Sequence, residues 1–284
     1  MSEPQVSVIV PLFGEHHGVR ALVAVCRNWL RQSVPCEVVV AVAEGTRLPD
    51  LGDGLRDGRI RVVPAPHDSI SPGPLRNLAV TASRAPVLYL GDADIAPLGE
   101  EFLAGALALE RERAVIQPWM YRLVDPDPGL DAPYLEPPAA GRACHVTMGR
   151  DGVLRAVGNE RFSRLGDSLM VVDPKSGDGW TGEDGKPWRP SPFHWGGIML
   201  SRTAFDAVGR YSERYVGWGC EDDDLIAKLD GTVGAVRAWR VARQLTCLHF
   251  EHPRTHTYAW LADNQRILAE RLAAGVDAMI KEDR

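Results

Sequence analysis

Short apolar runs recur through the first 115 residues of the chain, and segments with helical spacing separate them. Each run has the length of a β-strand and is apolar throughout, which is the pattern of a strand buried on both faces of a parallel sheet. The segments between them place apolar residues three or four positions apart, as on one face of a helix. This pattern predicts an α/β fold with a doubly wound, mostly parallel sheet. The predicted strands are residues 6–10, 37–42, 59–63 and 86–90, and the predicted helices are residues 19–31, 72–82 and 102–112.

The pattern changes between residues 124 and 192, where proline, glycine and aspartate are dense. A loop-rich segment of this length in a compact enzyme is usually a functional lid, or else partly disordered. Apolar order then resumes, with expected helices at residues 202–208, 221–229 and 257–271 and a strand at 245–250; the last helix could extend toward the terminus. We therefore expect one structural unit in three parts, at residues 1–120, 121–192 and 193–284.

Composition limits the partners and the compartment. A chain of 284 residues suits one large domain or two closely packed subdomains, and its net charge of −6 argues against a general nucleic-acid or anionic-membrane binder. Five cysteines without a CxxC pair indicate free thiols in a reducing compartment. The chain shows neither a signal-peptide pattern nor the roughly 18–20 apolar residues that span a bilayer, so we expect a cytoplasmic protein.

Polar clusters follow three of the predicted strands. Phe13-Gly14-Glu15 follows the first, Glu44-Gly45-Thr46 the second, and Asp92-Ala93-Asp94 the fourth. Because such sheets bind ligands at the carboxyl ends of their strands, we expect the clusters to converge on one edge. Two carboxylates separated by one residue can jointly face a divalent cation and a diphosphate, and their oxygens suit Mg²⁺ or Mn²⁺. An ordinary solvated turn is the alternative for Asp92 and Asp94.

Four consecutive acidic residues, 221–224, begin a predicted helix. Favourable interaction with the helix dipole would explain them without any chemistry. It does not explain Trp218, which lies between Gly217 and Gly219 just before them. Glycines permit close approach of a ligand, and an exposed indole can stack on a sugar. An acid in this position could also take the proton from an acceptor hydroxyl, so catalysis and capping both stay open.

Histidine, aromatic and arginine side chains complete the candidates. His249 and His252 can approach one metal if the backbone turns between them, and mixed Asp and His ligation fits Mn²⁺ better than Mg²⁺. The segment 193–198, with Trp195 and Gly197, is either core packing with a strand bend or a wall of a sugar pocket. Arg76 could meet a phosphate, although a surface position is the default. His194 and His256 are expected to be structural or surface residues.

These segments together resemble known glycosyltransferases. Residues 6–11 with Glu15, Arg76-Asn77, and Leu90-Gly91-Asp92-Ala93-Asp94 look like the N-terminal half of family-two enzymes with the GT-A fold. The segments at 195–198, 209–211 and 217–224 resemble the C-terminal part of β-1,4-galactosyltransferases and related bacterial polymerases. The resemblance covers most of the chain apart from residues 125–190. It implies a GT-A fold and an inverting transferase that uses a UDP-sugar and Mn²⁺ (or Mg²⁺).

The resemblance also implies a role for each matching residue. Asp222 would be the catalytic base, while the donor sugar and the acceptor would be bound by Trp195, Gly197, Trp218, Glu221 and Asp223. Asp94 would coordinate the cation together with His249 and His252, where the galactosyltransferases have a Met and a His at this spacing. The nucleotide would be bound by Pro11, Phe13, Glu15, Glu44, Arg76 and Asp92.

Donor and acceptor identity stay open at this stage. Glu44-Gly45-Thr46 stands where many relatives have Asp-Asp-Gly-Ser, and the acceptor could be a glycan, a natural product or a peptide. One alternative is a retaining enzyme of the polypeptide N-acetylgalactosaminyltransferase type, which would lack a full Glu-Asp-Asp-Asp run. Another is a non-catalytic sugar-nucleotide-binding protein, which would need the pocket but no positioned base.

Overall fold

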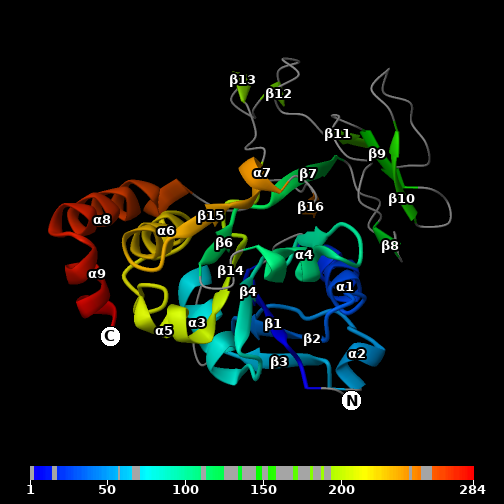
Figure 1. Cartoon of the computed structure of the whole chain (residues 1–284), viewed down its shortest axis with the longest axis horizontal. Helices are drawn as coiled ribbons and strands as arrows, with labels where there is room; N and C mark the ends of the chain where they lie inside the picture. The colour runs from blue at the N-terminus through cyan, green and yellow to red at the C-terminus, as the bar shows by residue number, and fades with distance from the viewer. Residues whose placement is uncertain are drawn as a thin grey trace.

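A computed structural model of the chain shows two seven-stranded β-sheets and a two-stranded one, with helices around the first sheet (Figure 1). The structure describes residues 3–14, 18–56, 58–65, 71–109, 113–124, 193–242, 245–250 and 258–284, together with short strand segments between residues 134 and 188. In this part of the chain no helix is long and apolar enough to cross a bilayer.

The first sheet has the strand order β15-β6-β14-β4-β1-β2-β3. All neighbouring pairs are parallel except those of β14, which is antiparallel to both β4 and β6. The expected doubly wound, mostly parallel sheet is therefore confirmed. Its strands are β1 (Val6–Leu12), β2 (Cys36–Val42), β3 (Ile60–Pro64), β4 (Val87–Leu90), β6 (Ala114–Ile116), β14 (Ile198–Ser201) and β15 (Ala235–Arg237).

Helices cover both faces of this sheet, which explains why its strands are apolar throughout. Val8 and Val10 of β1 belong to a core cluster with residues of α1 and α4. Ile9, between them, belongs to a second cluster with residues of α3, α5 and α6. The helices are α1 (Gly18–Trp29), α2 (Asp53–Arg56), α3 (Pro72–Ala82), α4 (Phe102–Ala108), α5 (Arg202–Ala207), α6 (Glu221–Gly231), α7 (Ala238–Val241), α8 (Leu261–Ala274) and α9 (Val276–Asp283), with the 3₁₀ turn η1 (Tyr258–Trp260) before α8.

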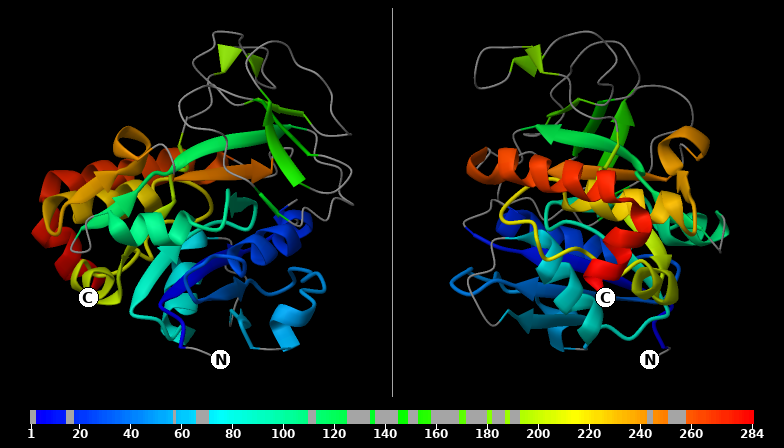
Figure 2. Two further views of the ribbon diagram at one scale, coloured as in Figure 1. Left: turned by 45° about the vertical axis from the view of Figure 1, so that its right-hand side comes forward. Right: turned by 90° about the vertical axis from the view of Figure 1, so that its left-hand side faces the viewer.

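The second sheet has the order β5-β16-β7-β11-β9-β10-β8. Figure 2 shows it on the side of the first sheet that is opposite the N-terminus. It places strands of the loop-rich segment next to β7 (Trp119–Val124). On its other side β7 pairs with β16 (Thr246–Phe250), which pairs in turn with β5 (Ile95–Pro97). The strands of that segment are β8 (Tyr134–Leu135), β9 (His145–Met148), β10 (Val153–Val157) and β11 (Leu169–Val171), and β12 (Trp180–Thr181) pairs with β13 (Pro187–Trp188). Most of the segment lies outside the described residues, so its role as a lid stays a prediction, as does the three-part division of the chain.

Among the element boundaries that differ from those expected, two have a clear local cause. The strand predicted to close at Pro11 continues to Leu12. The pairing of β1 with β4 ends at Ile9, so the missing N–H of Pro11 faces no partner strand. The closing helix does not extend to the terminus, because Gly275 interrupts it with φ +90° and ψ 157°, a conformation that side chains other than glycine rarely adopt.

Candidate functional site

The candidate site is centred on Arg76, which α3 carries into the interior. Pro72 occupies the first turn of this helix, where its missing N–H costs nothing. The Arg76 guanidinium is 2% exposed and lies 2.5 Å from Asp92 Oδ1, 3.3 Å from Asp222 Oδ1 and 3.8 Å from Glu221 Oε1. The two acidic clusters, separated by more than a hundred residues in sequence, therefore meet at one cation. A phosphate contact of Arg76 stays a prediction, because the structure places its guanidinium among carboxylates.

The Tyr211 side chain contacts both partners of this arrangement. The guanidinium of Arg76 lies 5.2 Å from the centroid of the Tyr211 ring, and the Tyr211 hydroxyl donates a hydrogen bond of 3.0 Å to Asp222 Oδ1. Burial by itself lowers the pKa of Arg76, but Tyr211, Asp222, Asp92 and Glu221 together hold that pKa well above its ordinary value. The guanidinium is a permanent cation at the centre of the site.

Asp92 is held through both of its carboxylate oxygens. Arg76 takes Oδ1, and His194 Nε2 lies 2.9 Å from Oδ2. Burial raises the pKa of Asp92, but Arg76 and His194 outweigh it and lower the pKa to about 2. His194 is 2% exposed. It is buried, as a structural histidine would be, but its partner is a residue of the predicted nucleotide site, which the sequence did not indicate.

Asp94 and His249 form the described part of the predicted metal site. His249 Nε2 of β16 lies 3.4 Å from Asp94 Oδ2, although 155 residues separate them in sequence. Two ligands of one octahedral cation, each about 2.1 Å from it, are about 3 Å apart, so the pair fits a shared Mn²⁺ or Mg²⁺. His252, the third predicted ligand, lies outside the described residues. Within the described residues no group of three or more histidine, cysteine or acidic side chains is arranged so that it could hold a metal ion.

The two carboxylate oxygens of Asp222, the predicted base, have different surroundings: Oδ1 accepts hydrogen bonds, and Oδ2 lies near the backbone of Gly196. Arg76 and Tyr211 both contact Oδ1. A Cβ placed on Gly196 would lie only 2.7 Å from Oδ2, so a side chain at this position would obstruct the carboxylate. The absence of a side chain at Gly196 therefore keeps one face of the Asp222 carboxylate clear.

The neighbouring acids have different surroundings. Burial and the charge of Asp222 raise the pKa of Glu221 to about 8, although Arg76 opposes them. Burial and Asp222 also raise the pKa of Asp223, which accepts a hydrogen bond of 3.0 Å from the indole N–H of Trp195. The Trp195 side chain is 45% exposed, so it presents an open apolar face beside Asp223. Glu221 is therefore protonated at neutral pH, whereas Asp223 fixes an exposed indole.

The fourth acid of the run has another environment. Asp224 is fully buried and contacts Arg271, Lys228 and Tyr215 instead of the Arg76 centre. On a helix, residues two positions apart point about 200° away from each other, so Asp222 and Asp224 face different sides of α6. Residues 221–223 of the acidic run thus lie at the site, whereas Asp224 lies in the interior.

Trp218 lies on the loop before α6 and is 42% exposed. The glycines beside it, Gly217 and Gly219, were expected to admit a ligand. A Cβ on Gly217 would instead lie 2.6 Å from Trp260 Cδ1, and one on Gly219 would lie 2.9 Å from Leu261 Cδ1. Both glycines also have positive φ. In the structure, Gly217 and Gly219 therefore allow the start of α8 to pack closely against this loop.

The remaining predicted residues that the structure describes lie at or near the ends of strands of the first sheet. Pro11 is buried in β1, Phe13 is half-buried just after it, and Glu44 is exposed after β2. Glu15 lies outside the described residues. Gly197 is buried, and a Cβ there would lie 2.5 Å from His194 Nδ1, so this glycine lets His194 reach Asp92.

Comparison with known proteins supports the fold and part of the sequence resemblance. The model of a family described as the N-terminal domain of galactosyltransferase matches residues 180–253 of this chain. This segment contains Trp195, Trp218, the acidic run and His249. No curated protein sequence matches the chain.

Solved glycosyltransferase structures share the fold at low sequence identity. The mannosyltransferase PcManGT from Pyrobaculum calidifontis, in complex with GDP-Man and Mn²⁺, has a TM-score of 0.51 at 14% identity, over 97% of this chain and 65% of that one. TarS 1-349 of S. aureus, in complex with UDP-GlcNAc, has a TM-score of 0.51 at 14% identity, over 98% and 71%. GalNAc-T7 with UDP, GalNAc and Mn²⁺ has a TM-score of 0.51 at 12% identity, over 88% and 44%.

The chain thus spans less than two thirds of the length of the mannosyltransferase and of GalNAc-T7. Identities this low establish the shared fold and leave substrates undetermined. The expected GT-A fold is confirmed. The match to the galactosyltransferase domain covers residues 180–253 of this fold.

Proposed function

We propose that the chain transfers a hexose or N-acetylhexosamine from a UDP-sugar to an acceptor hydroxyl, with inversion and with a divalent cation. The observation that carries this proposal is the meeting of Asp92 and Asp222 at the buried guanidinium of Arg76. One of these acids follows a strand of the parallel sheet and the other begins α6. A donor at the carboxyl edge of the sheet and an acceptor beside α6 would therefore meet at this point.

Asp222 is the proposed general base. Its Oδ1 is fixed by Arg76 and Tyr211, so the carboxylate has one orientation, and Oδ2 is available to take a proton from an acceptor hydroxyl. The hydroxyl oxygen would then attack the anomeric carbon as the bond to the nucleoside diphosphate breaks. A single attack from the side opposite the leaving group inverts the configuration.

Asp94 and His249 are the proposed metal ligands, with His252 as a predicted third. The separation of 3.4 Å between the first two fits one cation. A bound Mn²⁺ or Mg²⁺ would neutralise charge on a departing nucleoside diphosphate. Asp92, held by Arg76 and His194, would keep the turn that carries Asp94 in place.

The donor class rests on two arguments. The solved structures with this fold include complexes with GDP-Man and UDP-GlcNAc, which are nucleotide sugars. In this chain, Pro11, Phe13, Glu15 and Glu44 are the residues that we propose for the nucleoside, at the ends of β1 and β2. Trp195, Trp218, Glu221 and Asp223, together with Gly197 behind them, are proposed to surround the transferred sugar and the acceptor.

The proposal is tested by measuring nucleotide release from UDP-galactose, UDP-N-acetylgalactosamine, UDP-glucose, UDP-N-acetylglucosamine and GDP-mannose, with Mn²⁺ or with EDTA. We expect Mn²⁺-dependent release from a UDP-sugar, and we expect Asp222→Asn to lose turnover while it keeps UDP binding in calorimetry. Asp94→Ala should instead weaken Mn²⁺-dependent UDP binding.

Two outcomes would contradict parts of this proposal. Binding of nucleotide sugars without turnover, across a panel of sugar, lipid and peptide acceptors, would indicate a non-catalytic binder. A product whose anomeric proton shows retained configuration by NMR would exclude Asp222 as the base for a single inverting attack and would favour a retaining enzyme.

A further inference from the structure

Helix α8 contacts the segment that carries Trp218 through a buried asparagine. Asn264 is 1% exposed. Its amide nitrogen lies 2.9 Å from the carbonyl oxygen of Val216, 3.3 Å from that of Trp218 and 3.1 Å from that of Gly219, and its Oδ1 accepts from the Val216 N–H at 3.3 Å. One side chain thus satisfies several polar backbone groups of a buried loop, which would be costly to leave unpaired.

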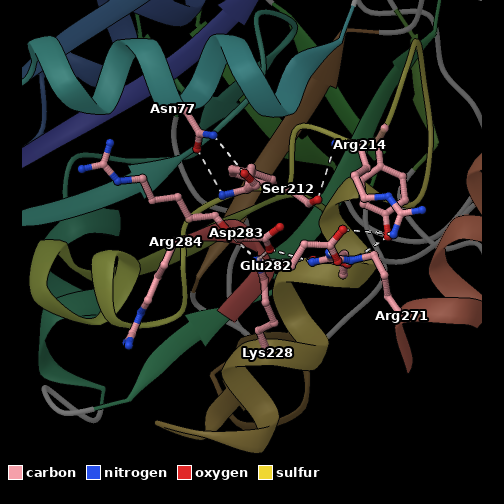
Figure 3. A network of polar contacts seen from close by, with 12 residues as sticks. Asn77, Ser212, Arg214, Lys228, Arg271, Glu282, Asp283 and Arg284 are labelled. Carbon is pink, nitrogen blue, oxygen red and sulfur yellow. Dashed lines mark hydrogen bonds and ion pairs between the residues drawn. The ribbon is translucent and has the colours of Figure 1, made fainter. Parts of the chain in front are cut away.

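Helix α8 also contacts the acidic run, residues 221–224, through a second buried side chain, Arg271. This residue is 2% exposed and donates from Nε to Asp224 Oδ2 at 2.6 Å. It also donates to Asp283 and Glu282 of the C-terminal helix α9, as Figure 3 shows. Asp224 is fully buried, so its charge depends on these partners and on Lys228.

The two contacts belong to one face of α8. Asn264 and Arg271 are seven positions apart, which is about two helical turns, so their side chains point in nearly the same direction. They reach the two ends of a segment, residues 216–224, that contains Trp218 and Asp222. Gly217 and Gly219 allow the start of α8 to pack directly on this segment.

A further contact joins the segment to the helix of Arg76. The N–H of Gly217 donates to the hydroxyl oxygen of Ser71 at 2.9 Å, and Ser71 immediately precedes α3. The segment is therefore held between α3, which carries the central guanidinium, and α8, which lies outside the site.

We propose that Asn264 and Arg271 are positioning residues of the transfer reaction. Asn264 fixes the loop of Trp218, and Arg271 fixes the turn of Asp222 through Asp224, although neither lies at the reacting atoms. This inference rests on the proposed function of the same site. It predicts a loss of turnover greater than the loss of donor binding when either contact is removed, because a small misplacement of the base slows the chemical step.

The first experiment replaces Asn264 with aspartate, which keeps the shape but presents a carboxylate to the three carbonyl oxygens. We expect kcat for UDP release, with the most active UDP-sugar and Mn²⁺, to fall about tenfold or more while KM for the donor changes by less than about threefold. The matched control is Asp263→Asn, the reverse exchange of the same two side-chain types at an exposed neighbouring position, which should leave both constants unchanged. Equal kcat in Asn264→Asp and in the control would overturn the role of Asn264.

The second experiment tests whether Arg271 acts through Asp224. Arg271→Gln, Asp224→Asn and the double variant should each lower kcat, and the double variant should lose much less than the product of the single effects. Met279→Ala, which removes a buried side chain of α9, serves as a control for lost stability. If Met279→Ala, assayed well below its melting temperature, lowers kcat as much as Arg271→Gln does, or if the two single effects multiply, the proposed coupling is wrong.

Hydrogen–deuterium exchange separates this inference from the proposed function. In Asn264→Asp and Arg271→Gln the amides of residues 216–224 should exchange faster than in the unaltered chain, while those of β1 and β2 should not. This measurement needs no turnover. If the unaltered chain releases no nucleotide, the proposed function fails, and unchanged exchange at residues 216–224 would refute the positioning contacts themselves.

Discussion

Glu221 provides a quantitative test of the site's electrostatics. The side chain is 5% exposed, and burial together with Asp222 raises its pKa to about 8, against the partial compensation of Arg76. Replacing it with glutamine keeps an oxygen that can accept from the Gly219 N–H, as Glu221 Oε2 does at 3.1 Å. Glutamine does not titrate, so this change removes the contribution of residue 221 to the pH dependence of stability and keeps the shape of the side chain.

The sign follows from the protons bound in each state. Between the ordinary value of 4.5 and about 8, the folded chain keeps a proton on Glu221 that the unfolded chain has lost. The free energy of unfolding therefore falls as pH rises through this range, by at most about 1.4 kcal/mol per pH unit. Over the whole range the loss amounts to roughly 4–5 kcal/mol, a large part of the stability of an ordinary domain.

The assay is urea unfolding followed by circular dichroism between pH 5 and pH 8.5, with EDTA present so that metal binding does not contribute. Relative to the unaltered chain, Glu221→Gln should gain stability steadily as pH rises and should be the more stable protein at pH 8. Asp277→Asn, on the C-terminal helix α9 and away from the Arg76 centre, is the control and should leave the pH dependence unchanged. Parallel stability curves for Glu221→Gln and the unaltered chain would refute the buried, protonated state of Glu221.

Four other predictions concern neighbouring features. The His194→Gln variant should retain Mn²⁺-dependent nucleotide release, because the glutamine amide can replace Nε2 beside Asp92. The His194→Phe variant should release nucleotide about tenfold more slowly, or slower still. Equal rates in the two variants would show that the contact with Asp92 has no role in the reaction. Gly196→Ala places a methyl group about 2.7 Å from Asp222 Oδ2 and should lower turnover with little change in melting temperature, as thermal unfolding beside the activity assay would show. Gly275→Ala should cost about 1–3 kcal/mol in urea unfolding, since φ +90° strains alanine although no atom obstructs its Cβ. Removal of Mn²⁺ with EDTA should lower the affinity of the unaltered chain for UDP, as measured by calorimetry. The same treatment should change the affinity of Asp94→Ala little.

The sequence predicted β1, β2, β3 and β4 of the first sheet, because fully apolar runs such as residues 6–10 and 37–42 have few other stable environments. It did not predict the three-residue strands β6 and β15 of the same sheet. Nor did it predict the strands between residues 134 and 188. Those strands are two to five residues long, and one of them, β11, pairs with β7, which lies outside the segment. Local composition therefore carries little of the information that places them. Turn-forming residues dominate that segment and predict loops.

The candidate site was predictable where its chemistry is local. Asp92, Asp94 and the acidic run stand out because consecutive or alternate carboxylates are conspicuous in any sequence. Helical geometry alone also indicates that Asp222 and Asp224 cannot share one function, since they face different sides of a helix. The contacts of Arg76 and His194 were not predictable, because they join residues that are far apart in the chain and depend on the completed sheet.

The charge balance around Arg76 links the two acidic clusters to a cation. With Glu221 protonated, the carboxylates of Asp92 and Asp222 share the single positive charge of Arg76, and Asp94 adds a further carboxylate beside Asp92. The described part of the site therefore has an excess of negative charge. A bare diphosphate would add further negative charge at the same edge and would be repelled. A divalent cation held by Asp94 and His249 would supply positive charge and would reverse that balance. On the proposed function, the donor would therefore bind together with its metal, while Arg76 holds the carboxylates of Asp92 and Asp222 together against their mutual repulsion.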